Sequence, residues 1–117
     1  MTTEMNRTGA QPFVALELSI QIIVALRDVV GVIRRNDNEV AQQIVRSASS
    51  IAANLAEGNG RQAKDRVRFF RYAAGSAEET RIHLRVALAW GWLGAEDVSA
   101  SMALIDRQLA LLWRLTH

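Results

Sequence analysis

The chain has 117 residues, which is enough for one domain that buries a core without metals or disulfides. It contains no cysteine, and this excludes disulfides, thiolate zinc sites and cysteine nucleophiles. Half of the residues are apolar and one is proline, which favours an all-α protein over a β-sandwich or a disordered chain. There are 14 basic and 12 acidic residues, so the net charge is only +2.

The chain opens with a polar stretch, residues 1–11, that lacks the apolar segment of a secretory signal. We predict that this stretch is a flexible tail and that residues 12–117 form a single domain. Pro12 suits the first turn of a helix, because the amide hydrogen that proline lacks has no partner there.

The first predicted helix runs from Pro12 to about Arg35 and carries two apolar faces. One set recurs at steps of three and four, as a core stripe does: Phe13, Leu16, Ile20, Ile23, Val30 and Ile33. The second set follows the same spacing on the adjacent face: Val14, Leu18, Ile22, Ala25, Val29 and Val32. A helix at the surface of a monomeric bundle needs one stripe of about 100°. Either this helix is buried on several sides within one subunit, or it also contacts another subunit, which we favour in so small a chain.

The same apolar stretch raises the question of a membrane span. Three charged residues interrupt it, Glu17, Arg27 and Asp28, whereas a span needs about 20 residues with few or no charges. We therefore expect a cytoplasmic protein that does not contact membranes.

The second predicted helix runs from about Glu39 to Glu57, with Asp37 or Asn38 as its cap. Its apolar stripe is Val40, Ile44, Ile51 and Leu55. Small polar side chains recur beside this stripe at the same spacing: Gln43, Ser47, Ser50, Asn54 and Glu57. Such side chains permit the close approach of a neighbouring helix and hydrogen bonds to it. The alternative is a solvated face.

The Gly58-Asn59-Gly60 turn ends this helix and organises the fold. A glycine in the left-handed conformation commonly ends a helix, and two glycines in three residues predict a helical hairpin. Glu57 lies at the negative end of the helix dipole, so we expect Arg61 or the amino end of the next helix to hold it. The alternative is that Glu57 points into water.

The third predicted helix runs from about Gln62 to Trp92. Its first part carries aromatic residues and five candidate nucleic-acid-binding cations: Arg61, Lys64, Arg66, Arg68 and Arg71. Basic side chains contact phosphates, and exposed aromatic rings stack on unpaired bases. The alternative is a solvated basic face beside core phenylalanines. Gly75, in the middle of the helix, costs about 1 kcal/mol relative to alanine, so we expect it to admit the polar stripe of the second helix.

The fourth predicted helix follows a break at Gly94 and begins near Ala95 or Glu96. Its seam steps by four and three: Val98, Met102, Ile105, Leu109 and Leu112. Further apolar residues lie outside the predicted seams and exceed what one subunit needs: Trp90, Trp92, Leu104, Leu111 and Leu115. Four helices with short connections predict an antiparallel up-down-up-down four-helix bundle.

No set of residues specifies a reaction. Di-iron bundles use Glu-x-x-His pairs, whereas Glu79 and His83 are four positions apart and the only other histidine is His117. No serine has a histidine base at a recognisable spacing. We predict a protein that is not an enzyme, with no catalytic residue, no metal and no cofactor.

Two stretches together resemble a known family. The pattern S-I-x-x-N-I-A-E-G-x-G-R and, on the next helix, F-L-x-I-A-x-G-S-x-x-E are approximately matched here. The matching residues form a structural motif: Arg46, Ser50, Asn54, Glu57, Gly58, Gly60, Gly75, Ser76 and Glu79. The chain resembles the four-helix-bundle proteins encoded in the intervening sequences of 23S ribosomal RNA genes. Ala52 stands where many members carry proline, and Val45 where many carry a second arginine, which weakens any basic site near Arg46.

The resemblance implies a homo-oligomer, specifically a pentamer of bundles, in agreement with the surplus of apolar residues. The family is also similar to the accessory variability determinant proteins of diversity-generating retroelements, which assist a reverse transcriptase and bind nucleic acid. The resemblance thus implies further copies of the chain, RNA or DNA, and a reverse transcriptase or another protein as partners. The rival hypothesis is a protein–protein interaction scaffold that binds no nucleic acid.

Overall fold

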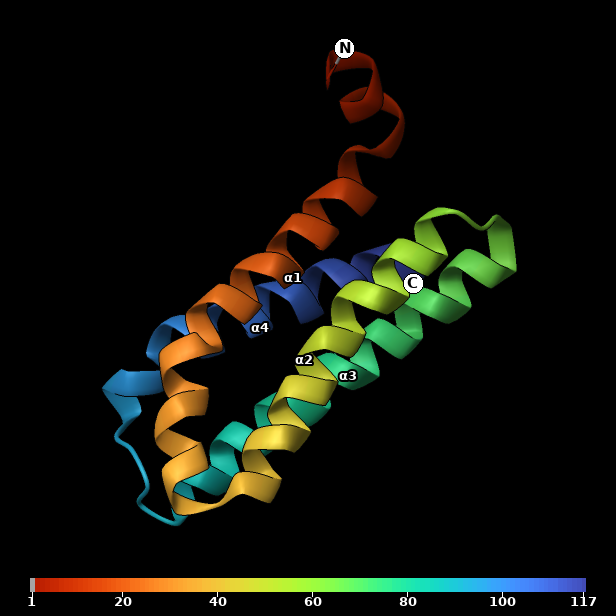
Figure 1. Cartoon of the computed structure of the whole chain (residues 1–117). Helices are drawn as coiled ribbons and strands as arrows, with labels where there is room; N and C mark the ends of the chain where they lie inside the picture. The colour runs from red at the N-terminus through yellow and green to blue at the C-terminus, as the bar shows by residue number, and fades with distance from the viewer. Residues whose placement is uncertain (1) are drawn as a thin grey trace.

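The computed structural model describes the backbone of residues 2–117 and the side chains from Val14 onward. Four helices and no strand make up the described chain: α1 (Thr2–Asn36), α2 (Asn38–Asn59), α3 (Ala63–Ala89) and α4 (Ala95–Thr116). Each helix packs against the next one, and α1 also packs against α4, so the four helices surround a common core (Figure 1). The predicted all-α class is confirmed, and the packing is consistent with the predicted bundle.

The amino-terminal helix is longer than predicted. It begins at Thr2, so Pro12 lies inside α1 and not in its first turn. A proline within a helix removes one backbone hydrogen bond and bends the helix, which need not end there. Figure 1 shows the first turns of α1 projecting beyond the other three helices. The start predicted at Pro12 is therefore wrong, while the flexibility of residues 1–11 stays a prediction.

The core face of α1 draws residues from both predicted apolar sets. Val30 and Ile33 of the first set are buried, as predicted. Leu18, Ile22 and Val29, which we assigned to the second face, are buried, whereas Ile20 is 44% exposed. Phe13 lies outside the residues whose side chains the structure describes. Because both faces of α1 are similarly apolar, the positions of α2 and α4 decide which face is buried.

Helix ends follow local chemistry. The Asp37 carboxylate caps α2 by accepting a hydrogen bond from the Val40 N–H at 3.1 Å, as predicted. The end of α3 at Ala89 precedes the predicted end, because Gly91 adopts a left-handed conformation with φ +77°. There the N–H groups of Gly91 and Trp92 bond to the carbonyls of Leu88 and Ala87, a Schellman motif.

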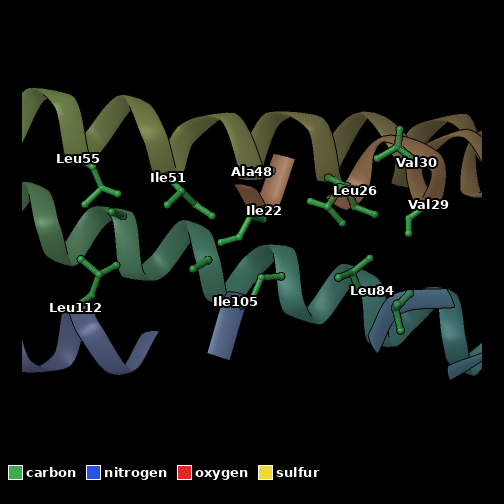
Figure 2. Close-up of a cluster of buried hydrophobic side chains, with 14 of the residues drawn as sticks. Ile22, Leu26, Val29, Val30, Ala48, Ile51, Leu55, Leu84, Ile105 and Leu112 are labelled. Carbon is green, nitrogen blue, oxygen red and sulfur yellow. The ribbon is translucent and has the colours of Figure 1, made fainter. Parts of the chain in front are cut away.

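The core draws apolar side chains from all four helices. Figure 2 shows side chains from each helix pointing toward one another: Ile22 and Leu26 of α1, Ile51 and Leu55 of α2, Leu84 of α3, and Ile105 and Leu112 of α4. In α4 the seam residues Val98, Ile105 and Leu112 are buried. Leu111 is also buried, and Leu104 and Leu115 pack partly against the core. α4 therefore leaves fewer apolar side chains exposed than predicted.

Several large apolar side chains nevertheless remain exposed on the described surface: Val14, Ile20, Val24, Val45, Tyr72, Ile82, Val86, Trp90 and Trp113. They are spread over all four helices. Within the described residues, none of the helices combines the length and the apolar character needed to span a membrane.

Candidate nucleic-acid interface

Buried hydroxyl groups join α2 to α3. The hydroxyls of Ser47 and Thr80 lie 2.8 Å apart, and both side chains are buried. Ser76 donates to the Ser50 hydroxyl at 2.9 Å. Interhelical hydrogen bonds are thus confirmed for these two serines of the polar stripe, and small side chains let the two helices approach closely.

Other motif residues make contacts within their own helix. The Asn54 amide donates to the carbonyl and the hydroxyl of Ser50, at 2.9 and 3.0 Å. Arg46 lies 3.5 Å from the Gln43 side-chain oxygen, and Glu79 lies 3.5 Å from His83. The stripe is therefore partly an interhelical seam and partly a set of local contacts.

The predicted contact between Glu57 and Arg61 is present. Arg61 donates two hydrogen bonds to one Glu57 oxygen, at 3.1 Å from Nε and 2.7 Å from Nη2. Both side chains are about half exposed, so solvent weakens this pair and its contribution to stability is small. Its clearer effect is to orient Arg61 at the α2–α3 turn.

Gly58 has a different role from the one predicted. The helix continues through Gly58 to Asn59, and Gly60 has φ −86°, so neither glycine is left-handed. Gly58 is buried, and a Cβ added there would lie 2.8 and 2.9 Å from two ring carbons of Phe70. The position requires glycine because the Phe70 ring occupies the space of a side chain.

The interpretation of Gly75 as a helix-contact residue is wrong. Gly75 is exposed, and a Cβ added there would meet no atom within 4 Å. The neighbouring Ser76 and Thr80 make the contact with α2 instead. Gly75 lines an open groove between α3 and α4.

Two of the five predicted cations are held by acidic and aromatic neighbours. Arg68 bonds to Asp65 at 3.1 Å, and its guanidinium lies 5.0 Å from the centre of the Phe69 ring and 5.9 Å from that of Tyr72. The Tyr72 phenol, followed by the Asp65 carboxylate, raises the pKa of Arg68 above its ordinary value. Arg61 also lies 5.0 Å from the centre of the Phe69 ring. These contacts fix the direction of both guanidinium groups.

The other three cations differ in how far their side chains are already engaged in hydrogen bonds. Arg66 donates to the Arg61 carbonyl at 3.2 Å, and Arg71 donates to the Thr116 carbonyl at 3.1 Å, which ties α3 to the end of α4. Lys64 is exposed and makes no ion pair with any residue whose side chain is described. Arg61 thus lies in the α2–α3 turn and the other four cations lie in the first turns of α3, with unequal capacity to bind a further anion.

One face of α3 presents an open, shallow site of about 700 Å³, which we call the groove on α3, and Lys64, Arg68, Arg71 and Tyr72 line it. Residues 14–114, which include this groove and most of every helix, match the family of 23S rRNA-intervening sequence proteins. The chain belongs to this family.

This member of the 23S rRNA-intervening sequence protein family is also similar in structure to a solved protein. That protein, of unknown function, is from the S23 ribosomal protein family of Bacteroides thetaiotaomicron VPI-5482. The two are 21% identical, the similarity covers 87% of this chain and 97% of that one, and the TM-score is 0.77. At this identity the comparison shows a shared fold. No curated protein matches the chain.

In this family member, sequence reasoning missed two residues beside the predicted basic segment. Trp113 is 62% exposed, and the His117 ring stacks on it with 3.4 Å between ring centres. Both line the α3–α4 groove, which also includes Arg71. The sequence does not connect them with the basic segment, because they lie at the end of α4 and directly after it. Only the packing of α4 against α3 brings them near that segment.

Proposed function

We propose that this 23S rRNA-intervening sequence protein is a homo-oligomeric accessory protein, without enzymatic activity, that binds RNA or another nucleic acid in the cytoplasm. The observation that carries the proposal is the exposed groove on α3, where Lys64, Arg68 and Arg71 lie beside Tyr72. Polyanion binding depends chiefly on such cations, because they displace counterions from phosphates. A family defined by its place in 23S rRNA genes suits a role in a ribonucleoprotein.

We also propose an antiparallel up-down-up-down order of helices. Connections of a few residues support it, since they return the chain beside the helix it has just left. The contacts between α2 and α3 support it as well, because residue numbers rise along α2 while those of their partners fall along α3. The contacting pairs are Ser47 with Thr80, Ser50 with Ser76, and Gly58 with Phe70.

Homo-oligomerisation, as a pentamer, is the second part of the proposal. Its support is the apolar surface that the bundle leaves exposed, including Val24 at 56% and Trp90 at 71%. Large exposed apolar side chains on a bundle this small suit contacts between subunits, which would cover part of them. Light scattering at micromolar concentration should give a particle of five times the 13.0 kDa subunit mass. A 13.0 kDa particle would refute this part of the proposal.

Several copies of the groove would strengthen a weak individual site. When subunits assemble, the second and later contacts with one long polyanion become intramolecular, so the apparent affinity rises without new contacts. The resemblance of the family to retroelement accessory proteins adds a reverse transcriptase to this hypothesis as a protein partner. A protein–protein scaffold without nucleic acid is the second candidate, and the same exposed apolar residues favour it.

A filter-binding salt series tests nucleic-acid binding directly. The full chain should retain RNA in dilute buffer, and the affinity should fall steeply as salt is added. Replacing Lys64, Arg68 and Arg71 by glutamine should weaken binding and reduce the salt slope by about 2, because each single-strand phosphate contact contributes about 0.7 to it.

The matched control removes the same charge elsewhere. Arg34, Arg35 and Arg85 are exposed and lie outside the groove, so their replacement by glutamine changes net charge equally. This control should retain most of the affinity. No RNA retention even in dilute buffer, or equal losses in both triple variants, would favour the scaffold.

A further inference from the structure

The groove on α3 and the groove between α3 and α4 meet at Arg71, and together they offer aromatic surfaces as well as cations. From this geometry we infer that the site takes single-stranded nucleic acid, with bases stacked on Tyr72 and Trp113 and phosphates held by Lys64, Arg68 and Arg71. The inference rests on the proposed function and adds the class of ligand.

The two grooves share one residue. Arg71 lines both the groove of about 700 Å³ on α3 and the groove of about 600 Å³ between α3 and α4. Its hydrogen bond to the Thr116 carbonyl holds its guanidinium at the junction. Cations therefore begin at Lys64, continue through Arg68 and reach Arg71 beside the second groove, as a path for a flexible phosphate backbone requires.

Each groove contains an exposed aromatic ring. Tyr72 is 49% exposed in the first, and Trp113 is 62% exposed in the second. The His117 ring lies on the Trp113 indole at 3.4 Å with 19° between the planes. His117 therefore covers one face of this indole, and a nucleobase would stack on the part of the ring that remains exposed.

Acidic residues near the grooves form ion pairs with arginines, although Arg81 is shared between Glu78 and Asp106. Asp65 pairs with Arg61 and Arg68, at 3.5 and 3.1 Å. Glu78, at the edge of the second groove, pairs with Arg81 at 2.7 Å. The residues that line the two grooves therefore keep a net positive charge, which complements a polyanion.

A duplex fits this arrangement less well than a single strand. Its base faces are stacked inside the helix, so it presents phosphates to Lys64 and Arg68 but no base face to Tyr72 or Trp113. An unpaired strand presents both, and stacking on an aromatic ring adds substantially to affinity for every kind of base. The arrangement therefore favours single strands with little preference for sequence.

Fluorescence anisotropy with the full chain tests the inference. The probes are labelled oligouridylate, labelled oligodeoxythymidylate and a blunt duplex of the same length, which separate RNA, DNA and paired strands. Both single strands should bind more tightly than the duplex. Tyr72→Leu and Trp113→Leu should each weaken single-strand binding on the order of tenfold and leave duplex binding unchanged.

Two controls separate stacking from packing. Tyr72→Phe keeps the ring and should retain the affinity for single strands. Trp90→Leu removes an indole that is 71% exposed but lines neither groove. Because Trp90 also belongs to the proposed interface between subunits, light scattering first establishes that the variant assembles as the wild type does, and its binding should then be unchanged. Single strands should also quench tryptophan emission in the wild type and in Trp90→Leu, but much less in Trp113→Leu.

The outcomes distinguish the two proposals. Equal binding of duplex and single strands, with no effect of Tyr72→Leu or Trp113→Leu, would overturn this inference and leave nucleic-acid binding in place. Inorganic polyphosphate that competes as well as oligouridylate would also overturn it, because polyphosphate carries no bases. Binding of none of the probes in dilute buffer would overturn both.

Discussion

Phe70→Ala should lower the free energy of unfolding by about 3–5 kcal/mol. Phe70 is the largest of the fully buried side chains, is only 2% exposed, and belongs to the core cluster. Removing its ring takes away buried apolar surface and leaves a cavity beside the α2–α3 turn. Urea unfolding, followed by circular dichroism at one fixed protein concentration, measures the change.

The adjacent phenylalanine is the matched control. Phe69 is only partly buried and contacts Arg61, Arg68 and Tyr72 at the surface. Cation–π contacts at exposed sites contribute about 0.5–1 kcal/mol each. Because Phe69→Ala removes little buried surface and leaves no closed cavity, it should cost clearly less than Phe70→Ala. Equal costs would mean that the core does not depend on Phe70 in the way described.

The sequence predicted α2 and the turn that follows it well, because the signals there are local. Asp37 as a cap, the serines at helical spacing and the break before Arg61 depend on neighbours within a few positions. The same holds for the contact between Glu57 and Arg61. Periodicity also gave four helices with nearly correct boundaries from α2 onward.

Predictions that depend on another helix were less successful. Two faces of α1 have similar apolar character, so periodicity alone could not place Ile20 at the surface and Ile22 in the core. Likewise, the predicted binding segment was a list of cations. Only the packing of α4 on α3 adds Trp113 to it, and only the contacts of Asp65 show that Arg68 is partly neutralised.

Glycines illustrate the same limit. The sequence shows that a position holds glycine, but it does not show why. Glycine can be needed because the backbone is left-handed there, or because a neighbouring residue leaves no space for a side chain. Among the described residues the left-handed glycine is Gly91, beyond the end of α3, while Gly58 has ordinary helical backbone and lacks room for a side chain. That room is taken by a residue of another helix, so no local pattern contains the information.

Gly58→Ala should therefore destabilise the protein by about 1–3 kcal/mol, the usual cost of overpacking a core. Alanine is a better helix former by about 1 kcal/mol, so propensity alone predicts the opposite sign. The added methyl would lie 2.8 and 2.9 Å from Phe70 ring carbons and 3.0 Å from the Phe69 Cβ, which forces the hairpin apart. Urea midpoints measured as for Phe70→Ala give the sign directly.

Gly75→Ala makes the matched comparison, since it is the same change in a helix with open space around it. It should stabilise the protein by about 0.5–1 kcal/mol. The double variant Gly58→Ala/Phe70→Leu should cost less than the sum of its single changes, because the smaller side chain leaves room for the methyl. Additive costs, or stabilisation by Gly58→Ala, would show that the Phe70 ring does not set the requirement for glycine.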